Sequence, residues 1–294
     1  MAGPVTDAHR IMFRENITLA LQESKDQFSD SFTYIGGVSG KQMQVTDIIG
    51  TIEARRNAPE GGDTPDLEGT HEPVWVRPER VDAGKLLKVE DAIKALTDFK
   101  SPYIQSMVNG VVRVKNIILA GALFGPRLIG NEVPVSTPWA GDTVPADLEQ
   151  QGTSSRMSVR KILNGLRLFE DADVDPEMER ITIAMSPQAN EELYNDITFT
   201  SKDYRNKAVM EEKRVKEILG MPIKITKRIG QYDANTLQSA MYCQSGMHWG
   251  PAMPLTVKSQ PNPAKEYREH PYIELWLAAT RSEDKKVIKI LSKK

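Results

Sequence analysis

The run ITIAMSPQANEELYNDITFTSKDYRNKAVMEEKRVKEILGMPIKITKRI, residues 181–229, decides the fold. It opens with an apolar segment that is typical of a buried strand. Ser186 then suits the N-cap of a short helix, because a Pro follows it in the first turn. Thr200 and Asp203, three residues apart, resemble a capping box at the start of a second, longer helix.

The longer helix is expected to end at Gly220, and a strand is expected over Met221–Lys227. Its apolar residues at helical spacing are Tyr204, Ala208, Val215, Ile218 and Leu219. The order strand, helix, helix, strand predicts an α+β layer in which helices pack on a small sheet.

Four further helices are predicted from apolar residues at helical spacing, over residues 6–24, 89–99, 103–124 and 156–170. The first carries Phe13, Ile17, Ala20 and Leu21 on one face, and the third, the longest, would span roughly 30 Å. Short strands are expected over residues 31–35, 42–49, 239–244 and 255–258. Two C-terminal strands, Tyr272–Ala279 and Lys286–Leu291, are expected to form a sheet of their own beside the longest helix.

Residues 50–87 predict a long hairpin that cannot stand alone. Its arms, Thr51–Arg56 and His71–Leu87, flank a centre rich in glycine, proline and carboxylates that has no apolar periodicity. An isolated two-stranded hairpin is marginal in water, so it must lie on something else. We interpret it as a docking arm rather than a surface loop, since arginines surround a tryptophan in it. The interface residues expected are Arg55, Arg56, Trp75, Arg77 and Arg80, with the arginines meeting carboxylates of an adjacent subunit.

Composition argues against several classes of protein. The chain has 294 residues, a net charge of −2 and 39% apolar residues, as in a soluble globular protein of one large domain or two modest ones. The basic residues are spread along the chain, which argues against a dedicated nucleic-acid binder. Cys243 is the only cysteine, so a reducing compartment fits. The start lacks an apolar signal segment, and the most apolar stretch, Val111–Phe124, is too short for a membrane span.

We find no catalytic, cofactor or metal motif. The four histidines lie in no nucleophile motif, and one cysteine cannot supply a structural zinc site. Cys243 and His248 are close in sequence, but a buried cysteine beside an unrelated histidine explains them better than a catalytic pair. The acidic centre of the hairpin lacks the ligand spacing of a calcium loop. The basic C-terminus is interpreted as a protected strand edge.

The segment SPQANEELYNDITFTSKDY, residues 186–204, resembles a pattern found in tailed-phage major capsid proteins: a Ser-Pro helix start, an acidic helix and a T-S-x-D-Y step. The C-terminal part of the chain agrees with it, since MHWG at 247–250 and AATRSEDKKVIKI at 278–290 resemble the strand and turn before the final strand of that family. The resemblance implies an HK97-like capsid fold of α+β class, with an N-terminal arm, an extended E-loop hairpin, a spine-helix peripheral domain and an axial domain.

Carried onto this chain, the resemblance implies four parts: residues 1–48 as the N-terminal arm, 49–87 as the E-loop, 88–154 with 263–294 as the peripheral domain, and 155–262 as the axial domain. The exposed loops of the axial domain, Asn195–Ser201 and Ile229–Gln238, would lie at the capsomer axis.

The implied function is structural. Many copies would form pentamers and hexamers of an icosahedral head enclosing double-stranded DNA, in the virion and, during assembly, in the host cytoplasm. A separate scaffolding protein, a portal and a decoration protein would be partners, and a membrane would not. Two alternatives stay open at this point: an encapsulin-like compartment of the same fold, and a small α+β enzyme with its pocket at Cys243 or His248.

Overall fold

The computed structural model describes residues 25–50, 52, 69–85, 100–131, 133–147, 155–195, 216–265 and 268–294. Several predicted features lie outside these residues. They are the helices over 6–24 and 89–99, the hairpin centre with Arg55 and Arg56, the capping box at Thr200 and Asp203, and most of the helix that follows it.

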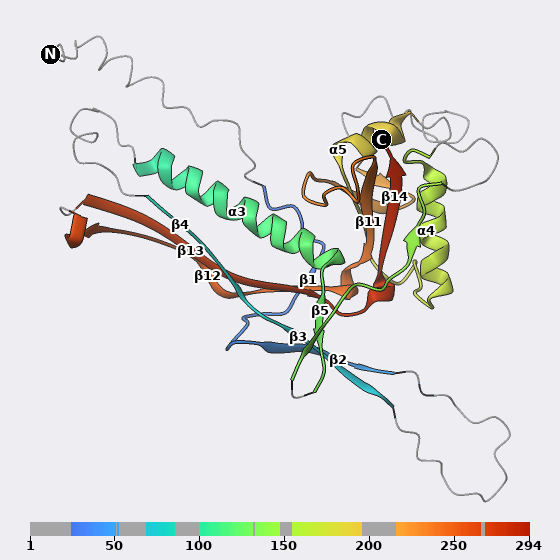
Figure 1. The fold of residues 1–294 in the computed structure, drawn as a ribbon, viewed down its shortest axis with the longest axis horizontal. Helices are drawn as coiled ribbons and strands as arrows, with labels where there is room; N and C mark the ends of the chain where they lie inside the picture. Colours follow the sequence, from blue (N-terminus) through green and yellow to red (C-terminus); the bar gives the residue numbers. More distant parts are fainter. Residues whose placement is uncertain are drawn as a thin grey trace, which may run out of the picture.

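One long helix lies on a four-stranded sheet (Figure 1). The helix is α3, Lys100–Phe124, which confirms the predicted spine. The sheet has the order β1-β12-β13-β4, with β1 at Thr33–Tyr34, β12 at Met247–Asn262, β13 at Arg268–Arg281 and β4 at Glu79–Gly84. Alternate residues of β13 face the helix, so Ile273 and Leu277 are buried in one core with Leu119 and Leu123.

A second, six-stranded sheet forms the other half of the molecule, in the order β7-β14-β11-β8-β10-β9. Its strands are β7 (Thr143–Val144), β14 (Val287–Lys293), β11 (Thr236–Cys243), β8 (Ile181–Met185), β10 (Met221–Ile225) and β9 (Glu217–Ile218). The helices of this half are α4 (Val159–Asp171) and α5 (Pro187–Tyr194).

Both faces of this sheet are buried. Ile183 of β8 and Met241 of β11 belong to the core under α4 and α5, whereas Ala184 and Tyr242, their sequence neighbours, belong to the core shared with α3. All five residues of β8 are buried, as the apolar start of the opening run predicts. The predicted cap of α5 is also confirmed, since the Ser186 side chain accepts a hydrogen bond from the Ala189 amide at 3.1 Å.

A third sheet, of four antiparallel strands, carries the hairpin at the lower right of Figure 1. Its order is β2-β3-β5-β6, with β2 at Met43–Ile49, β3 at His71–Val76, β5 at Arg127–Ile129 and β6 at Val135–Thr137. The chain between β2 and β3 holds the hairpin centre. Short 3-10 turns at Gln244–Gly246, Pro263–Lys265 and Asp284–Lys286 complete the described elements.

Three predictions from the sequence are wrong in detail. The arm His71–Leu87 is not one strand: β3 stays in the hairpin sheet, and after Arg77 and Pro78 the chain crosses to pair as β4 with β13. A proline has no backbone N–H to continue a ladder, which explains a break at this point.

The two C-terminal strands do not share a sheet. β13 pairs with β12 and β4, but β14 pairs with β11 and β7 in the six-stranded sheet. Val287, Ile288 and Ile290 of β14 are completely buried, and a strand buried on both faces needs a sheet with cover on both faces.

The predicted helix also does not reach Leu219. Ile218 belongs to β9, and Leu219 and Gly220, with φ of 50° and 77°, form the two-residue turn into β10. Two consecutive positive φ angles are typical of a type I′ turn, whose twist matches a hairpin.

Candidate assembly surface and junction

Trp75 lies inside the hairpin sheet. Its backbone pairs with Gln44 on one side and Leu128 on the other, and its indole N–H donates to the Gly130 carbonyl at 2.7 Å. The side chain is half-buried, and its polar atom has a partner, as an enclosed indole requires. Trp75 therefore positions the base of the hairpin within its own chain, and its contact with a neighbouring subunit stays a prediction.

Arg80 uses its charge within its own chain. Its Nε lies 3.1 Å from a carboxylate oxygen of Glu274, its Nη2 donates to the Tyr272 hydroxyl, and its guanidinium lies 5.9 Å from the ring centroid of Trp276. These partners lie on β13, directly across from β4. Half of the Arg80 side chain is still exposed, so a further contact to a neighbour has room.

Arg77 differs from Arg80. It is exposed in the two-residue link between β3 and β4, and it makes no ion pair within the part of the chain that the structure describes. Arg55 and Arg56 lie outside the described residues. Of the predicted arginines, Arg77 is thus the clearest candidate for a contact between subunits.

The three sheets meet at a cluster of charged residues that the sequence analysis missed; we call Arg127, Arg281 and Asp284 the junction cluster. Arg281, at the end of β13, is buried, and its Nη1 donates to the carbonyl oxygens of Ala122, Leu123 and Gly125 at 3.1, 2.9 and 3.1 Å. These carbonyls lie at and just after the end of α3, which is the negative end of the helix dipole, so a cation satisfies them well.

Asp284 connects the two arginines. Its carboxylate accepts from Arg281 Nε at 2.7 Å and lies 3.6 Å from Arg127 Nε. Arg127, on β5, also donates to the Ser282 carbonyl and lies 3.5 Å from Glu72 of β3. Burial lowers the pKa of Arg281. The cluster therefore links the end of α3, the hairpin sheet and the turn that leads into β14. The only sequence signal was an Arg and an Asp three residues apart in what reads as a turn.

A second contact joins the same halves. The Lys289 ammonium, on β14, lies 4.1 Å from the ring centroid of Trp139, 4.7 Å from that of Phe124 and 5.5 Å from that of Tyr232. Phe124 is the last residue of α3. Burial lowers the pKa of Lys289. Cation–π attraction of this kind, worth roughly 0.5–2 kcal/mol, holds the six-stranded sheet against the end of α3.

Cys243 does not have the environment of a nucleophile. It is completely buried in the core under α4, and burial raises the pKa of its thiol to about 12. Burial lowers the pKa of His248. A reactive cysteine needs a thiolate in a partly exposed, electropositive environment, and Cys243 has the opposite.

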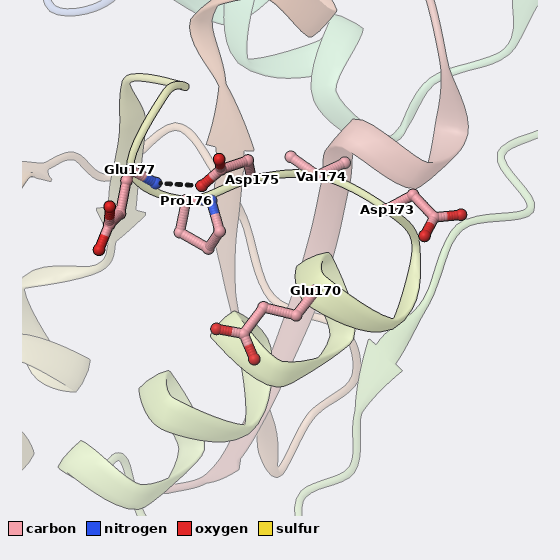
Figure 2. A pocket seen from close by; sticks show the side chains of 6 residues that line it. All are labelled: Glu170, Asp173, Val174, Asp175, Pro176 and Glu177. Atoms are coloured by element: carbon pink, nitrogen blue, oxygen red, sulfur yellow. Dashed lines mark hydrogen bonds between the residues drawn. The ribbon is translucent and has the colours of Figure 1, made fainter.

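The described surface also carries a shallow pocket of about 600 Å³ after α4, lined by Glu170, Asp173, Val174, Asp175, Pro176 and Glu177. Figure 2 shows the carboxylates pointing in different directions, and that of Asp175 accepts a hydrogen bond from the Glu177 amide at 2.9 Å. Among the described residues no group of His, Cys, Asp or Glu side chains is arranged to hold a metal ion. The pocket thus lacks the convergent groups that catalysis requires.

The described residues combine a spine helix on one sheet, a hairpin sheet and a second layered domain, and the cysteine among them is buried and has the raised thiol pKa of an unreactive side chain. The model of the family described as "Phage capsid protein" matches residues 5–294, so this chain belongs to that family. It is a structural protein of a capsid shell, and neither the compartment nor the enzyme alternative is favoured.

Solved structures agree on the fold. The capsid of the cyanophage P-SCSP1u superposes with a TM-score of 0.71 at 12% identity, over 94% of this chain and 90% of that chain. Mycobacterium phage Che8 gives 0.69 at 11%, over 94% of both chains. The capsid of a native GTA particle gives 0.68 at 11%, over 95% of this chain and 93% of that chain. The HK97-like expectation is thereby confirmed, while no curated protein sequence matches this chain.

Proposed function

We propose that this chain forms the pentamers and hexamers of an icosahedral phage head that encloses double-stranded DNA. The supporting observation is the family match over nearly the whole chain, together with a hairpin sheet that projects from the body (Figure 1). A separate scaffolding protein, a portal and a decoration protein belong to the proposal, with assembly in the host cytoplasm and without a membrane. No catalytic role is included in it.

The proposed domain organisation has the four parts of the family. They are the arm over 1–48, the E-loop over 49–87, the peripheral domain over 88–154 with 263–294, and the axial domain over 155–262. Strand pairing supports adjustments at several boundaries. β4 and β12 belong with the peripheral sheet, because both pair with β13. β14 and β7 belong with the axial sheet, because they pair with each other and β14 also pairs with β11. The loops Asn195–Ser201 and Ile229–Gln238 are the proposed contacts at the capsomer axis.

Negative-stain microscopy of the purified chain, alone and with a co-expressed scaffolding protein, tests the main proposal. Uniform closed shells are expected in at least one of the two preparations. A chain that stays monomeric in both, although folded, contradicts it. Shells that hold protein cargo instead of nucleic acid after production in a phage-infected host would contradict the DNA-enclosing role.

Arg77 provides the test of the proposed interface, in which Arg55, Arg56, Trp75, Arg77 and Arg80 face an adjacent subunit. Arg77→Glu reverses an exposed charge that has no ion pair in the described part of its own chain, so the subunit is expected to keep its unfolding midpoint. Assembly is expected to weaken. An exposed ion pair contributes ~0–1 kcal/mol, so the critical concentration rises up to about fivefold for each intersubunit pair that is broken.

Arg77→Lys is the matched control, since it keeps the charge and is expected to assemble like the wild type. Light scattering of assembly at several salt concentrations measures both variants. If Arg77→Glu assembles as well as Arg77→Lys at moderate salt, Arg77 makes no such contact. Arg80→Glu is a poorer test, because it also breaks the pair with Glu274 inside the chain.

A further inference from the structure

The loop that joins β10 to β11, residues 226–235, carries opposite charges near its two ends. Lys227 lies two residues after β10, and Asp233 lies three residues before β11. Both residues are exposed, and neither makes an ion pair within the part of the chain that the structure describes. Two charges of opposite sign are therefore available to a partner.

The six-stranded sheet keeps these two charges apart. β8 lies between β10 and β11 in the order of strands, and the Thr226 amide donates to the Met185 carbonyl at the end of β8 at 2.9 Å. The loop therefore crosses the end of β8. Because neighbouring strands lie about 4.8 Å apart, the two ends of the loop are roughly 10 Å apart. Lys227 thus lies on the β10 side of the loop and Asp233 on its β11 side.

The acidic end of the loop is held in place by Lys294, which follows β14. The Lys294 amide donates to the Asn235 carbonyl at 3.0 Å, and its ammonium donates to the Ala234 carbonyl at 2.7 Å and to Gln231 Oε1 at 2.9 Å. Residues 231–235 are nevertheless all exposed. A surface that is ordered before binding loses less conformational freedom in a contact, so this end of the loop is suited to recognition.

The carboxylate of Asp233 is fixed within this end of the loop. Its Oδ1 accepts a hydrogen bond from the Asn235 amide at 2.8 Å. Hydrogen bonds from the Asn235 amide and the Thr236 side chain lower the pKa of Asp233, so the carboxylate is charged at neutral pH. Asp233 therefore presents a negative charge at a defined position on the surface.

Opposite charges on the two sides of one loop suit a ring of identical subunits. Contacts in a ring are head-to-tail, so one side of each copy meets the other side of the next copy. A loop with its base on one side and its acid on the other is then complementary to the same loop in the next copy. We propose that Lys227 of each copy pairs with Asp233 of the next copy around such a ring. This inference rests on the proposed function, which places the loop Ile229–Gln238 at the capsomer axis.

A double-mutant cycle on assembly tests the pair, with light scattering under the conditions in which the wild type forms shells. Lys227→Gln and Asp233→Asn each remove one charge, and Asp233→Asn keeps an acceptor for the Asn235 amide, so both subunits are expected to keep their unfolding midpoint. Each single change is expected to raise the critical concentration for assembly up to about fivefold. The double variant is expected to assemble no worse than either single variant, because the same pair is lost only once.

Lys227→Arg is the matched control, since it keeps the charge and is expected to keep the wild-type critical concentration. Two results overturn the pair: either single change has no effect at low ionic strength, or the two effects multiply in the double variant, as they do for independent sites. If the wild type forms neither rings nor shells, the proposed function fails and the pair fails with it. Normal assembly of the wild type without coupling between the two positions overturns the pair alone.

Discussion

Lys161, in α4, carries a charge into the core of the half that contains the six-stranded sheet. Its side chain is completely buried, and its ammonium donates to the carbonyl oxygens of Ser155 at 2.7 Å and Leu291 at 2.9 Å. Burial lowers the pKa of Lys161 to about 8, although Glu192 and Asp147 act in the opposite direction. The ammonium connects the segment just before α4 to β14. Removing the cation from water raises the free energy of the folded state, which opposes this gain.

The stability of the subunit is therefore expected to depend on pH through this residue. Between pH 8 and the ordinary lysine value of 10.5, the unfolded chain binds the proton that the folded chain has released, so the free energy of unfolding rises with pH. The full rise is roughly 3 kcal/mol. Lys161→Met removes the titration, so the wild type should gain stability relative to this variant over that window.

Urea unfolding of both proteins at several pH values measures the difference, and Lys258→Met, at an exposed position of β12, is the control. The hydrogen bonds that Lys161→Met removes add an offset that does not change with pH. A difference between the two proteins that stays flat across the window would refute the buried-cation interpretation.

At the scale of elements, the β9–β10 hairpin depends on one glycine. Gly220 has a φ of 77°, and a Cβ added there meets nothing within 4 Å, so only backbone strain opposes a substitution. Gly220→Ala is expected to lower the free energy of unfolding by about 1 kcal/mol, and Gly220→Asn by less, because asparagine enters the left-handed region more readily. Chemical unfolding of the two variants distinguishes them. Equal losses of stability would show that the space around the turn, and not its backbone, sets the cost.

Local signals account for what the sequence predicted well. The spacing of apolar residues predicted α3, and the Ser186-Pro187 pair predicted the start of α5, because both depend only on neighbours along the chain. Ile218 and Leu219 were assigned to the wrong element, since two apolar residues before a glycine fit both the end of a helix and a hairpin.

Pairing between distant strands could not be predicted. β13 and β14 are adjacent in sequence with a turn between them, which favours a hairpin, but the burial of β14 on both faces places it in the other sheet. The junction cluster was missed for the same reason. The sequence alone predicts that Arg281 lies in a turn. Its partners, the carbonyls at the end of α3, are distant in sequence and come close to it only in the folded chain.

At the scale of the whole molecule, the two halves are joined where the end of α3 meets the turn before β14. The junction cluster and the aromatic rings around Lys289 both lie there, and both connect α3 to the six-stranded sheet. Since Asp284 is the carboxylate shared by Arg127 and Arg281, its charge holds two cations in place. The six-stranded sheet has one core under α4 and α5 and shares a second core with α3, so this joint and the shared core both connect the two sheets.

Asp284→Asn is expected to uncouple the halves. The substitution keeps the shape but leaves Arg281 without a counter-charge and Arg127 with Glu72 alone, and removing one partner of a buried pair costs about 3–5 kcal/mol. Calorimetry of the unassembled wild type is expected to give one unfolding transition, whereas the variant gives two, one for each half. Asp147→Asn, which removes an exposed pair with Lys293, is the control and should keep a single transition. A single transition in Asp284→Asn, merely shifted to lower temperature, would mean that the coupling resides in the packing of α3 and the rings around Lys289 rather than in the charge of Asp284.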